Sequence, residues 1–181
     1  MVCICLCDAL ESKKVTIFRT GKWEFVDGND VLYGKFGSEI TNITKMKISH
    51  IEHIGIAVKS IDEAIPFYED VLGLKCYAVE EVKDQKVKTA FFKVGETKIE
   101  LLESTDPEGP IGKFIEKKGE GMHHLAFAVD DLAGALPEVE EKGIRLIDKT
   151  PRKGAEGLNI GFLHPKSTFG VLTELCEDPS S

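Results

Sequence analysis

Residues 122–129, with the sequence MHHLAFAV, decide the fold because they repeat a stretch that occurs earlier in the chain. The earlier copy is IEHIGIAV at residues 51–58. In each copy a histidine heads a short apolar run of the kind that forms a β-strand, and a helix signal follows it. His53 and His124 hold the matching positions, 71 residues apart. A strand that recurs together with its polar residue indicates a duplicated structural unit.

A second pair of predicted strands carries a matching carboxylate. TKIELLE at residues 97–103 is interrupted by Glu100, and GVLTELCE at residues 170–177 is interrupted by Glu174, 74 residues later. Because side chains alternate along a strand, Glu100 lies on the face opposite to its apolar neighbours. Two histidines and two glutamates at matched spacings predict one four-ligand site between the two halves of the chain.

The composition is typical of a globular protein and argues against a nucleic-acid surface. The chain has 181 residues, of which 42% are hydrophobic and 30% are charged, with a net charge of −8. Binding to a phosphate backbone needs a basic stripe, which this sequence lacks. The notable basic pairs are Lys117-Lys118 and Arg152-Lys153. Such pairs are typical of solvated helix ends or loops, although they also suit a phosphorylated small molecule.

Cysteine usage and the N-terminus predict a cytoplasmic protein. The five cysteines are an odd number and no secretory signal precedes them, which favours free thiols in a reducing compartment. The apolar residues 2–7 are too few to span a bilayer. We therefore expect no membrane partner.

Residues 1–46 lie outside the duplicated pattern and predict an N-terminal extension of short strands, at 15–18, 23–26 and 31–33. The spacing of Cys3, Cys5 and Cys7 suits a soft metal, but alternate residues of one strand rarely close a metal site, so a plain apolar strand is the favoured interpretation. The role of this extension cannot be read from the sequence. We expect one domain over residues 47–181.

The first module, about residues 48–103, predicts a strand, a helix and three further strands. Ser60 and Glu63 form a capping box at the start of the helix, and Gly73 ends it. Pro66 lies within this helix and predicts a distortion of its turns. The predicted elements are a strand at 51–58, a helix at 61–72, and strands at 75–82, 86–94 and 97–103.

The second module, about residues 119–177, repeats this order after a connector at 104–121 that contains a short helix. Asp130 is the predicted N-cap of its helix and Gly143 the C-cap. The predicted elements are helices at 111–118 and 131–142, and strands at 122–129, 144–148, 158–163 and 169–176. The predicted fold class is therefore α+β, with two paired βαβββ modules whose uncovered sheet faces meet around a cleft.

The four matched residues suit a divalent metal ion with five or six ligands, with one or two positions left for substrate. We expect Co²⁺ first, with Mn²⁺, Ni²⁺ and Zn²⁺ as alternatives. His123 and His124 are neighbours, so strand alternation predicts that only His124 faces the cleft and that His123 lies on the other face. His50 and His164 have no counterparts in the repeat and are expected at the surface or in turns.

From about Ile48 to Glu177 the chain resembles the vicinal oxygen chelate superfamily and, within it, the methylmalonyl-CoA epimerases. The resemblance is carried by HIGIAV at 53–58, TKIELLE at 97–103, GEGMHHLAF at 119–127 and HPKSTFGVLTEL at 164–175. It implies paired βαβββ modules and the metal ligands His53, Glu100, His124 and Glu174. It also implies an acyl-CoA substrate, a homodimer, and interconversion of the (2R) and (2S) forms of methylmalonyl-CoA through an enolate that the metal stabilises.

The proton-transfer residues are less completely specified. Glu174 is the first candidate base, and Glu100, its partner in the repeat, is the candidate for the opposite face. Some family members have a glutamate near the position of Lys88-Thr89-Ala90, where this chain has no acid, and Lys88 is a remote alternative. For the substrate carboxylate or the CoA phosphates the loop before the last strand offers Lys166, Ser167 and Thr168, which equally suit a solvated turn.

Three other functions are compatible with such a fold. A glyoxalase I-type lyase or isomerase also uses four ligands and carboxylate bases. An extradiol dioxygenase uses two histidines and one glutamate around Fe(II), so the fourth ligand Glu100 argues against it. A metal-free small-molecule binding module has no need for four matched ligands. The fold by itself does not decide between these functions.

Overall fold

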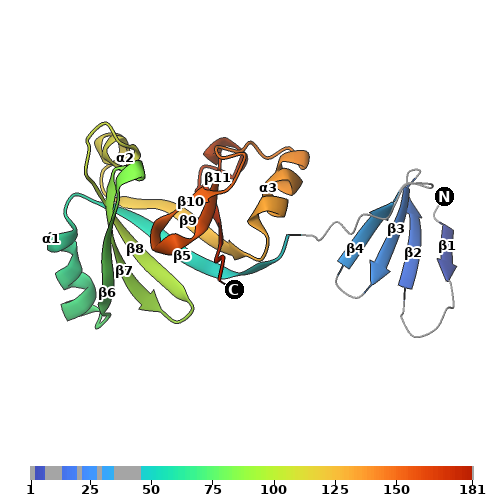
Figure 1. Ribbon diagram of the computed structural model, residues 1–181, viewed down its shortest axis with the longest axis horizontal. Helices are drawn as coiled ribbons and strands as arrows, with labels where there is room; N and C mark the ends of the chain where they lie inside the picture. The colour runs from blue at the N-terminus through green and yellow to red at the C-terminus, as the bar shows by residue number, and fades with distance from the viewer. Residues whose placement is uncertain (1–2, 7–13, 20–21, 28–29, 35–45, 181) are drawn as a thin grey trace. The chain divides into compact units, whose positions relative to one another are not determined.

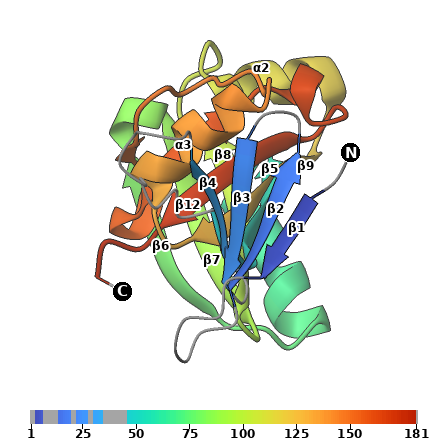
Figure 2. The same cartoon turned by 90° about the vertical axis from the view of Figure 1, so that its right-hand side faces the viewer.

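A computed structural model describes residues 3–6, 14–19, 22–27, 30–34 and 46–180. The chain divides into two compact units, Met1–Lys45 and Met46–Ser181. In the first unit four strands form an antiparallel sheet in the order β1-β2-β3-β4 (Figure 2). They are β1 (Cys3–Leu6), β2 (Lys14–Arg19), β3 (Lys22–Asp27) and β4 (Asp30–Gly34). These strands contain the three predicted segments, whereas Cys7 lies outside the described residues.

The second unit has the predicted α+β composition and two similar halves. The first half comprises β5 (Ile48–Val58), α1 (Ile61–Pro66), the π-helix η1 (Phe67–Val71), β6 (Cys76–Val82), η2 (Lys83–Gln85), β7 (Val87–Val94) and β8 (Thr97–Ser104). The helix α2 (Pro110–Lys118) connects it to the second half. The second half comprises β9 (Gly121–Val129), α3 (Leu132–Glu141), β10 (Arg152–Lys153), η3 (Ala155–Gly157), β11 (Asn159–Leu163), η4 (Pro165–Ser167) and β12 (Leu172–Glu177).

The two halves share one eight-stranded sheet, in the order β10-β11-β12-β9-β5-β8-β7-β6 (Figure 1). In each half the first strand pairs in parallel with the last, β5 with β8 and β9 with β12. The two halves join where β5 and β9 pair in antiparallel fashion. From the central pair outward, each half contributes its first, fourth, third and second strand, so the two halves of the sheet are arranged alike. The predicted α+β fold of two paired βαβββ modules is confirmed, and the two modules join edge to edge through β5 and β9 in a single sheet.

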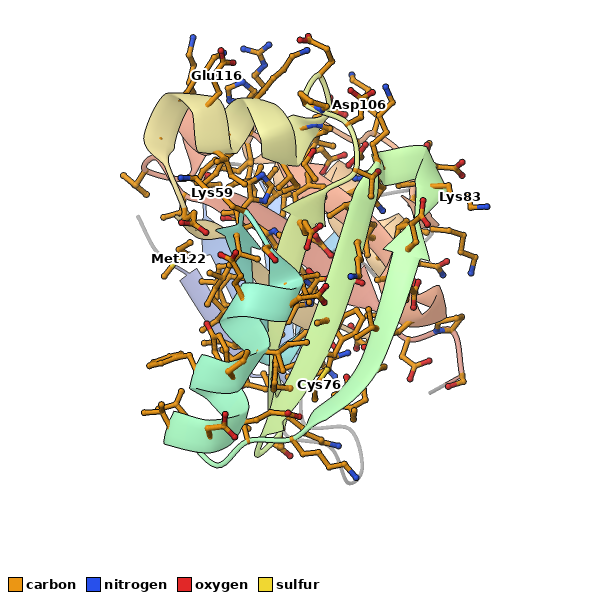
Figure 3. The ribbon with its side chains drawn as sticks, turned by 90° about the vertical axis from the view of Figure 1, so that its left-hand side faces the viewer. Lys59, Cys76, Lys83, Asp106, Glu116 and Met122 are labelled. Atoms are coloured by element: carbon orange, nitrogen blue, oxygen red, sulfur yellow. The ribbon has the colours of Figure 1, made fainter. Side chains whose placement is uncertain are left out.

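One helix from each half covers the sheet on the side away from the matched polar residues. α1 lies over one face of the strands of the first half (Figure 3). It packs on Val58, Phe92 and Leu101, and α3 packs through Leu132 and Leu136 on the second half. The repeat extends to the helix starts: the carboxylate of Glu103 accepts the Ile61 amide at 2.6 Å, and that of Glu177 accepts the Leu132 amide at 3.2 Å. No helix in the described ranges is long and apolar enough to cross a membrane.

The α1 region shows the predicted cap and the predicted distortion. The Ser60 hydroxyl accepts the Glu63 amide at 3.3 Å. Pro66 has no amide hydrogen to donate, and the helix changes from α to π geometry immediately after it, at Phe67. Gly73 follows with a φ of 69°, which closes the helix as expected.

Two details of the second half differ from the prediction. The N-cap of α3 is Asp131 and not Asp130, because the Asp131 carboxylate accepts the Gly134 amide at 2.9 Å. The predicted strand at 144–148 is wrong, since it forms only an isolated bridge between Leu146 and Leu163. The Asp148 carboxylate accepts the Phe162 amide at 3.0 Å, so a side chain replaces the backbone partner that a continuing strand would supply.

Candidate functional site

The strand register brings the four matched residues together in two rows across the four central strands. In one row, Gly55 of β5 has Glu100 beside it on β8 and His124 beside it on β9. In the other row, Ala126 of β9 has Glu174 beside it on β12 and His53 beside it on β5. Each row therefore reads glutamate, small residue, histidine. Because β5 and β9 run antiparallel, the rows have opposite orders and their side chains converge.

Small residues at the centre of each row make room for the imidazole rings. A Cβ atom at Gly55 would lie 2.2 Å from Cε1 of His124, closer than any real contact. Ala126 is completely buried. The glycine in HIGIAV is therefore needed at this position because any side chain there would collide with the His124 ring.

The four polar side chains are buried and their donor atoms face one another. Each residue has an exposed fraction of 7% or less. Nε2 of His53 lies 2.8 Å from Nε2 of His124 and 3.5 Å from Oε2 of Glu100. Nε2 of His124 lies 3.6 Å from Oε2 of Glu100 and 3.5 Å from Oε2 of Glu174. Buried imidazole nitrogens and carboxylate oxygens directed at a common point fit a divalent first-row metal ion.

The adjacent Glu52 fixes the orientation of the His53 ring. Its carboxylate accepts a hydrogen bond from Nδ1 of His53, which leaves Nε2 directed at the site. Neighbouring residues on a regular strand point to opposite faces. Here the register slips, because Ile51 pairs with Phe127 and His53 with Ala126, which leaves Glu52 without a residue opposite it. This bulge lets Glu52 and His53 approach the same space.

Burial and neighbouring charges set the protonation of the metal-free site. Burial lowers the pKa of His53, but the hydrogen bond with Glu52 and the charges of Glu100 and Glu174 outweigh it and raise the pKa to about 9. Burial, followed by the charge of His53, holds the pKa of His124 well below its usual value. Burial raises the pKa of Glu100 to about 7 and also raises that of Glu174. In the metal-free site both carboxyl groups therefore keep their protons to a higher pH than an exposed glutamate does.

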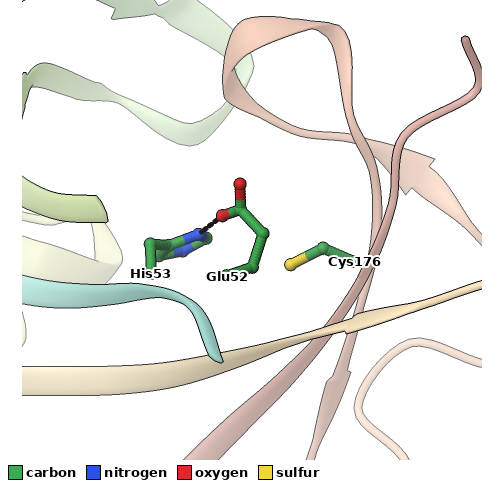
Figure 4. A group of neighbouring side chains, drawn as sticks. All are labelled: Glu52, His53 and Cys176. Carbon is green, nitrogen blue, oxygen red and sulfur yellow. Dashed lines mark hydrogen bonds and ion pairs between the residues drawn. The ribbon is translucent and has the colours of Figure 1, made fainter. Parts of the chain in front are cut away.

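A second cluster shares His53 with this site. Ligand atoms of Glu52, His53 and Cys176 lie within 4.8 Å of one another (Figure 4). The Cys176 thiol donates to Oε1 of Glu174 at 3.1 Å, and burial, followed by the charge of Glu174, raises its pKa. A thiol binds metal as its thiolate, which this environment disfavours. His53, His124 and Glu174, whose ligand atoms also lie within 4.8 Å of one another, suit a metal ion better.

The four residues line a pocket of about 540 Å³. Much of its wall is apolar, with Val87, Phe91, Leu102, Ile111, Leu158, Ile160 and Phe162. Lys98, Arg152 and Lys153 add positive charge, and the Arg152 guanidinium lies 5.3 Å from the centre of the Phe162 ring. The lining also contains the carboxylates of Asp84 and Glu156, and Lys98 and Arg152 are held in ion pairs with Glu156 and Asp148. A pocket with an apolar wall and such charged groups suits a ligand that carries both apolar and charged parts.

His123 does not face away from the pocket as predicted. It lines the same pocket as His124, and its ring packs edge-on against Phe114 of α2 at a centroid distance of 4.9 Å. The cause is another register slip. His124 pairs with Gly55 and Met122 with Ile56, so His123 has no residue opposite it and strand alternation fails locally.

The other candidates from the sequence lie away from the pocket lining. Lys88 pairs with Asp62 at 3.5 Å, while its neighbour Thr89 lines the pocket. Lys166, Ser167 and Thr168 belong to the turn around η4 and do not line the pocket. The Ser167 hydroxyl accepts the Arg145 amide, and that of Thr168 donates to the Val171 carbonyl. His164 caps that turn, as expected of a turn residue.

Sequence reasoning missed Glu52, Lys98 and Cys176 as neighbours of the site. Lys98 pairs with Glu52 at 2.5 Å, and Cys176 contacts Glu174. Lys98 and Cys176 lie two residues from Glu100 and Glu174, so strand alternation could have placed them on the same face. Glu52 depends on a bulge, for which the sequence carries no signal.

Comparison with known proteins identifies the family. Residues 52–162 match the Glyoxalase/Bleomycin resistance protein/Dioxygenase superfamily. The uncharacterized protein YqjC of Bacillus subtilis is 47% identical over 130 residues, which cover 72% of this chain and 93% of that protein. The mitochondrial methylmalonyl-CoA epimerase of Mus musculus is 37% identical over 130 residues, which cover 71% of this chain and 73% of that protein.

A solved structure shows the same similarity in three dimensions. A Streptomyces coelicolor methylmalonyl-CoA epimerase variant in complex with 2-nitronate-propionyl-CoA is 36% identical, with a TM-score of 0.72. The match covers 74% of this chain and 97% of that one. With its duplicated strand–helix–strand order and its paired histidines and glutamates, this chain belongs to the glyoxalase/bleomycin resistance protein/dioxygenase superfamily, among relatives that include methylmalonyl-CoA epimerases.

Proposed function

We propose that this protein is a metal-dependent epimerase that interconverts (2R)- and (2S)-methylmalonyl-CoA. The observation that carries the proposal is the convergence of His53, Glu100, His124 and Glu174 at one buried point of the pocket. Relatives that are epimerases of this thioester support the choice of substrate. A cytoplasmic location and a homodimeric state belong to the same proposal.

The four residues would hold the metal through two Nε2 atoms and two carboxylates. Bound there, a divalent cation supplies Lewis-acid stabilisation of negative charge on the substrate oxygens. Glu52 keeps Nε2 of His53 directed toward the site by accepting the hydrogen bond from Nδ1. Co²⁺ is our first choice of metal, and Mn²⁺, Ni²⁺ and Zn²⁺ use the same donors.

The two carboxylates reach the site from different halves of the chain, Glu100 from β8 and Glu174 from β12. Epimerisation at C2 requires a proton to leave one face of the carbon and another to arrive on the opposite face. Glu174 takes the proton from one epimer and Glu100 serves the other face. In the metal-free site burial raises the pKa of both groups.

The pocket cations suit the anionic parts of an acyl-CoA. Arg152 and Lys153 were a basic pair of undecided role in the sequence, and both line the pocket. Arg152 also pairs with Asp148 at 3.2 Å, which leaves Lys153 as the better test. The Lys153→Gln variant should raise the KM for the CoA thioester and leave kcat nearly unchanged, because a contact to the CoA part stabilises the bound substrate and the transition state equally.

Proton NMR of methylmalonyl-CoA in D2O tests the proposal. The metal-stripped protein should leave the C2 proton signal intact, and added Co²⁺ should make it disappear. Glu174→Gln and Glu100→Gln, tested separately on each pure epimer, should each block exchange more strongly for one epimer. Exchange at the background rate with Co²⁺ bound would contradict the proposal. The hemithioacetal of glutathione and methylglyoxal, supplied in parallel, tests the glyoxalase-type alternative.

A further inference from the structure

Three charged side chains form a continuous chain of contacts that ends on His53. Oε1 of Glu52 lies 2.5 Å from Nζ of Lys98, and Oε2 of Glu156 lies 2.6 Å from the same ammonium group. Glu52 in turn accepts the hydrogen bond from Nδ1 of His53. The side chains of Glu52, Lys98 and Glu156 have exposed fractions of only 12%, 15% and 24%. Their contacts are therefore less screened than those of a surface ion pair.

The positions of these residues explain why the contacts form. Lys98 lies directly beside His53 in the parallel register of β5 and β8. The bulge at Glu52 turns its carboxylate toward the same space, so Lys98 meets it there. A regular β5 would direct Glu52 to the opposite face. The bulge therefore places the Glu52 carboxylate at Nδ1 of His53, the nitrogen that faces away from the site, and lets the Lys98 ammonium group contact that carboxylate.

Glu156 brings the second half of the unit into the same chain of contacts. It lies in the loop at residues 152–157, which contributes Arg152, Lys153, Ala155 and Glu156 to the pocket wall. Besides Lys98, the Glu156 carboxylate accepts the Tyr77 hydroxyl of β6 at 3.0 Å. Glu156 also has a φ of 52°, a conformation that a non-glycine residue keeps only when its surroundings hold it. This loop is thus fixed to the first half by Lys98 and Tyr77.

We propose that Glu52 is the positioning residue of His53, and that Lys98 holds Glu52 in place while tying it to the 152–157 loop through Glu156. The inference rests on the metal site of the proposed function. A carboxylate that accepts the second nitrogen of a ligating histidine fixes the ring orientation and increases the basicity of the ligating nitrogen. Lys98 contacts both Glu52 and Glu156, so the position of the pocket wall and the orientation of the ligand are linked.

The test measures Co²⁺ binding, without substrate, to the full-length protein. Glu52→Gln keeps the shape of the side chain but loses its charge, so the Kd for Co²⁺ should rise roughly 10- to 100-fold. The visible absorption spectrum of the bound Co²⁺ should change with it, because His53 is held less firmly. Glu52→Asp, which retains the charge, should recover part of the loss. Glu140→Gln is the matched control, since Glu140 pairs with Lys149 at an exposed surface and should leave both readouts unchanged.

A double-mutant cycle tests the role of Lys98. If Lys98 acts through Glu52, Lys98→Met should weaken Co²⁺ binding, and adding it to Glu52→Gln should cause little further loss. Purely additive losses would overturn the link between the two residues. A Glu52→Gln protein that binds Co²⁺ with the wild-type Kd and spectrum would overturn the positioning role. Wild-type protein that binds no Co²⁺ would instead contradict the proposed metal site itself, so the two failures are distinguishable.

Discussion

At the scale of single residues, the site depends as much on small side chains as on its ligands. Gly55 and Ala126 lie at the centres of the two rows, each between a glutamate on one side and a histidine on the other. Larger side chains there would occupy the space into which the imidazoles turn. The polar residues supply the chemistry, and the two small residues allow them to meet.

Gly55→Ala should therefore damage the site more than the fold. The added Cβ would lie 2.2 Å from the His124 ring and must displace it, so we expect Co²⁺ affinity and proton exchange to fall at least about 10-fold, as for loss of ligand orientation. Gly161→Ala is the matched control. Its Cβ would meet Leu136 at 3.0 Å in the core under α3, so it should cost about 1–3 kcal/mol in the free energy of unfolding and spare metal binding. Unchanged Co²⁺ binding in Gly55→Ala would contradict the packing argument.

Metal binding should also release protons. Burial lowers the pKa of His53 but the carboxylates outweigh it, so the metal-free group titrates at about 9, and burial raises the pKa of Glu100 to about 7. At pH 7 His53 holds close to one proton and Glu100 about half a proton, so Co²⁺ binding should release roughly 1.5 protons. Affinity should be level above pH 9, fall as the pH drops below 9 where His53 takes up a proton, and fall more steeply below 7 where Glu100 does so too. Calorimetry in two buffers of different ionisation enthalpy measures this release, and equal heats in both would count against it.

At the scale of secondary-structure elements, each half begins its helix in the same way. A carboxylate from the end of the last strand accepts the first amide of the helix, Glu103 for α1 and Glu177 for α3. A local cap assists each of them, Ser60 in the first half and Asp131 in the second. The start of each helix is thus held both by a local side-chain cap and by the strand that carries Glu100 or Glu174.

The two neighbouring aspartates before α3 give a direct test of the cap. Asp131→Ala removes the acceptor of the Gly134 amide and should cost about 1 kcal/mol in the free energy of unfolding. Asp130→Ala, one residue earlier, should change the free energy of unfolding much less. Urea unfolding of both variants measures the difference. Equal losses, or a larger loss for Asp130→Ala, would restore the sequence-based assignment.

The elements also show what could be predicted from the sequence and what could not. The repeat predicted the order of strands and helices. It also identified His53, Glu100, His124 and Glu174 as one set, because polar residues that recur at matched positions of apolar strands can be recognised from the sequence alone. Glu52 was missed, and His123 was predicted on the wrong face, because strand alternation fails at bulges. Bulges depend on pairing with a distant strand. The strand predicted at 144–148 failed because the Asp148 side chain takes up a backbone amide.

At the scale of the whole molecule, the candidate site described above lies in the second unit. All four candidate ligands and the pocket lining lie within Met46–Ser181. This unit begins at Met46, whose backbone nitrogen lies 2.6 Å from the Glu138 carboxylate of α3. We propose that the domain of residues 47–181 acts without the N-terminal extension of residues 1–46.

Removal of residues 1–45 tests whether the domain acts without the extension. A chain that starts at Met46 should fold cooperatively and bind Co²⁺ with the same Kd as the full chain, because it keeps every site residue. Thermal unfolding and Co²⁺ titration of the two chains side by side measure both properties. A truncated chain that is unfolded, or that has lost Co²⁺ affinity, would show that the extension contributes to the site.

We propose that a duplicated histidine and glutamate build one metal site at the join of β5 and β9. Crystals grown with Co²⁺ and measured at its absorption edge test it most directly. We predict a single strong anomalous peak, within about 2.0–2.2 Å of Nε2 of His53 and His124 and of a carboxylate oxygen of Glu100 and Glu174. A peak bound instead by Glu52, His53 and Cys176, or no peak between the two histidines, would contradict the account.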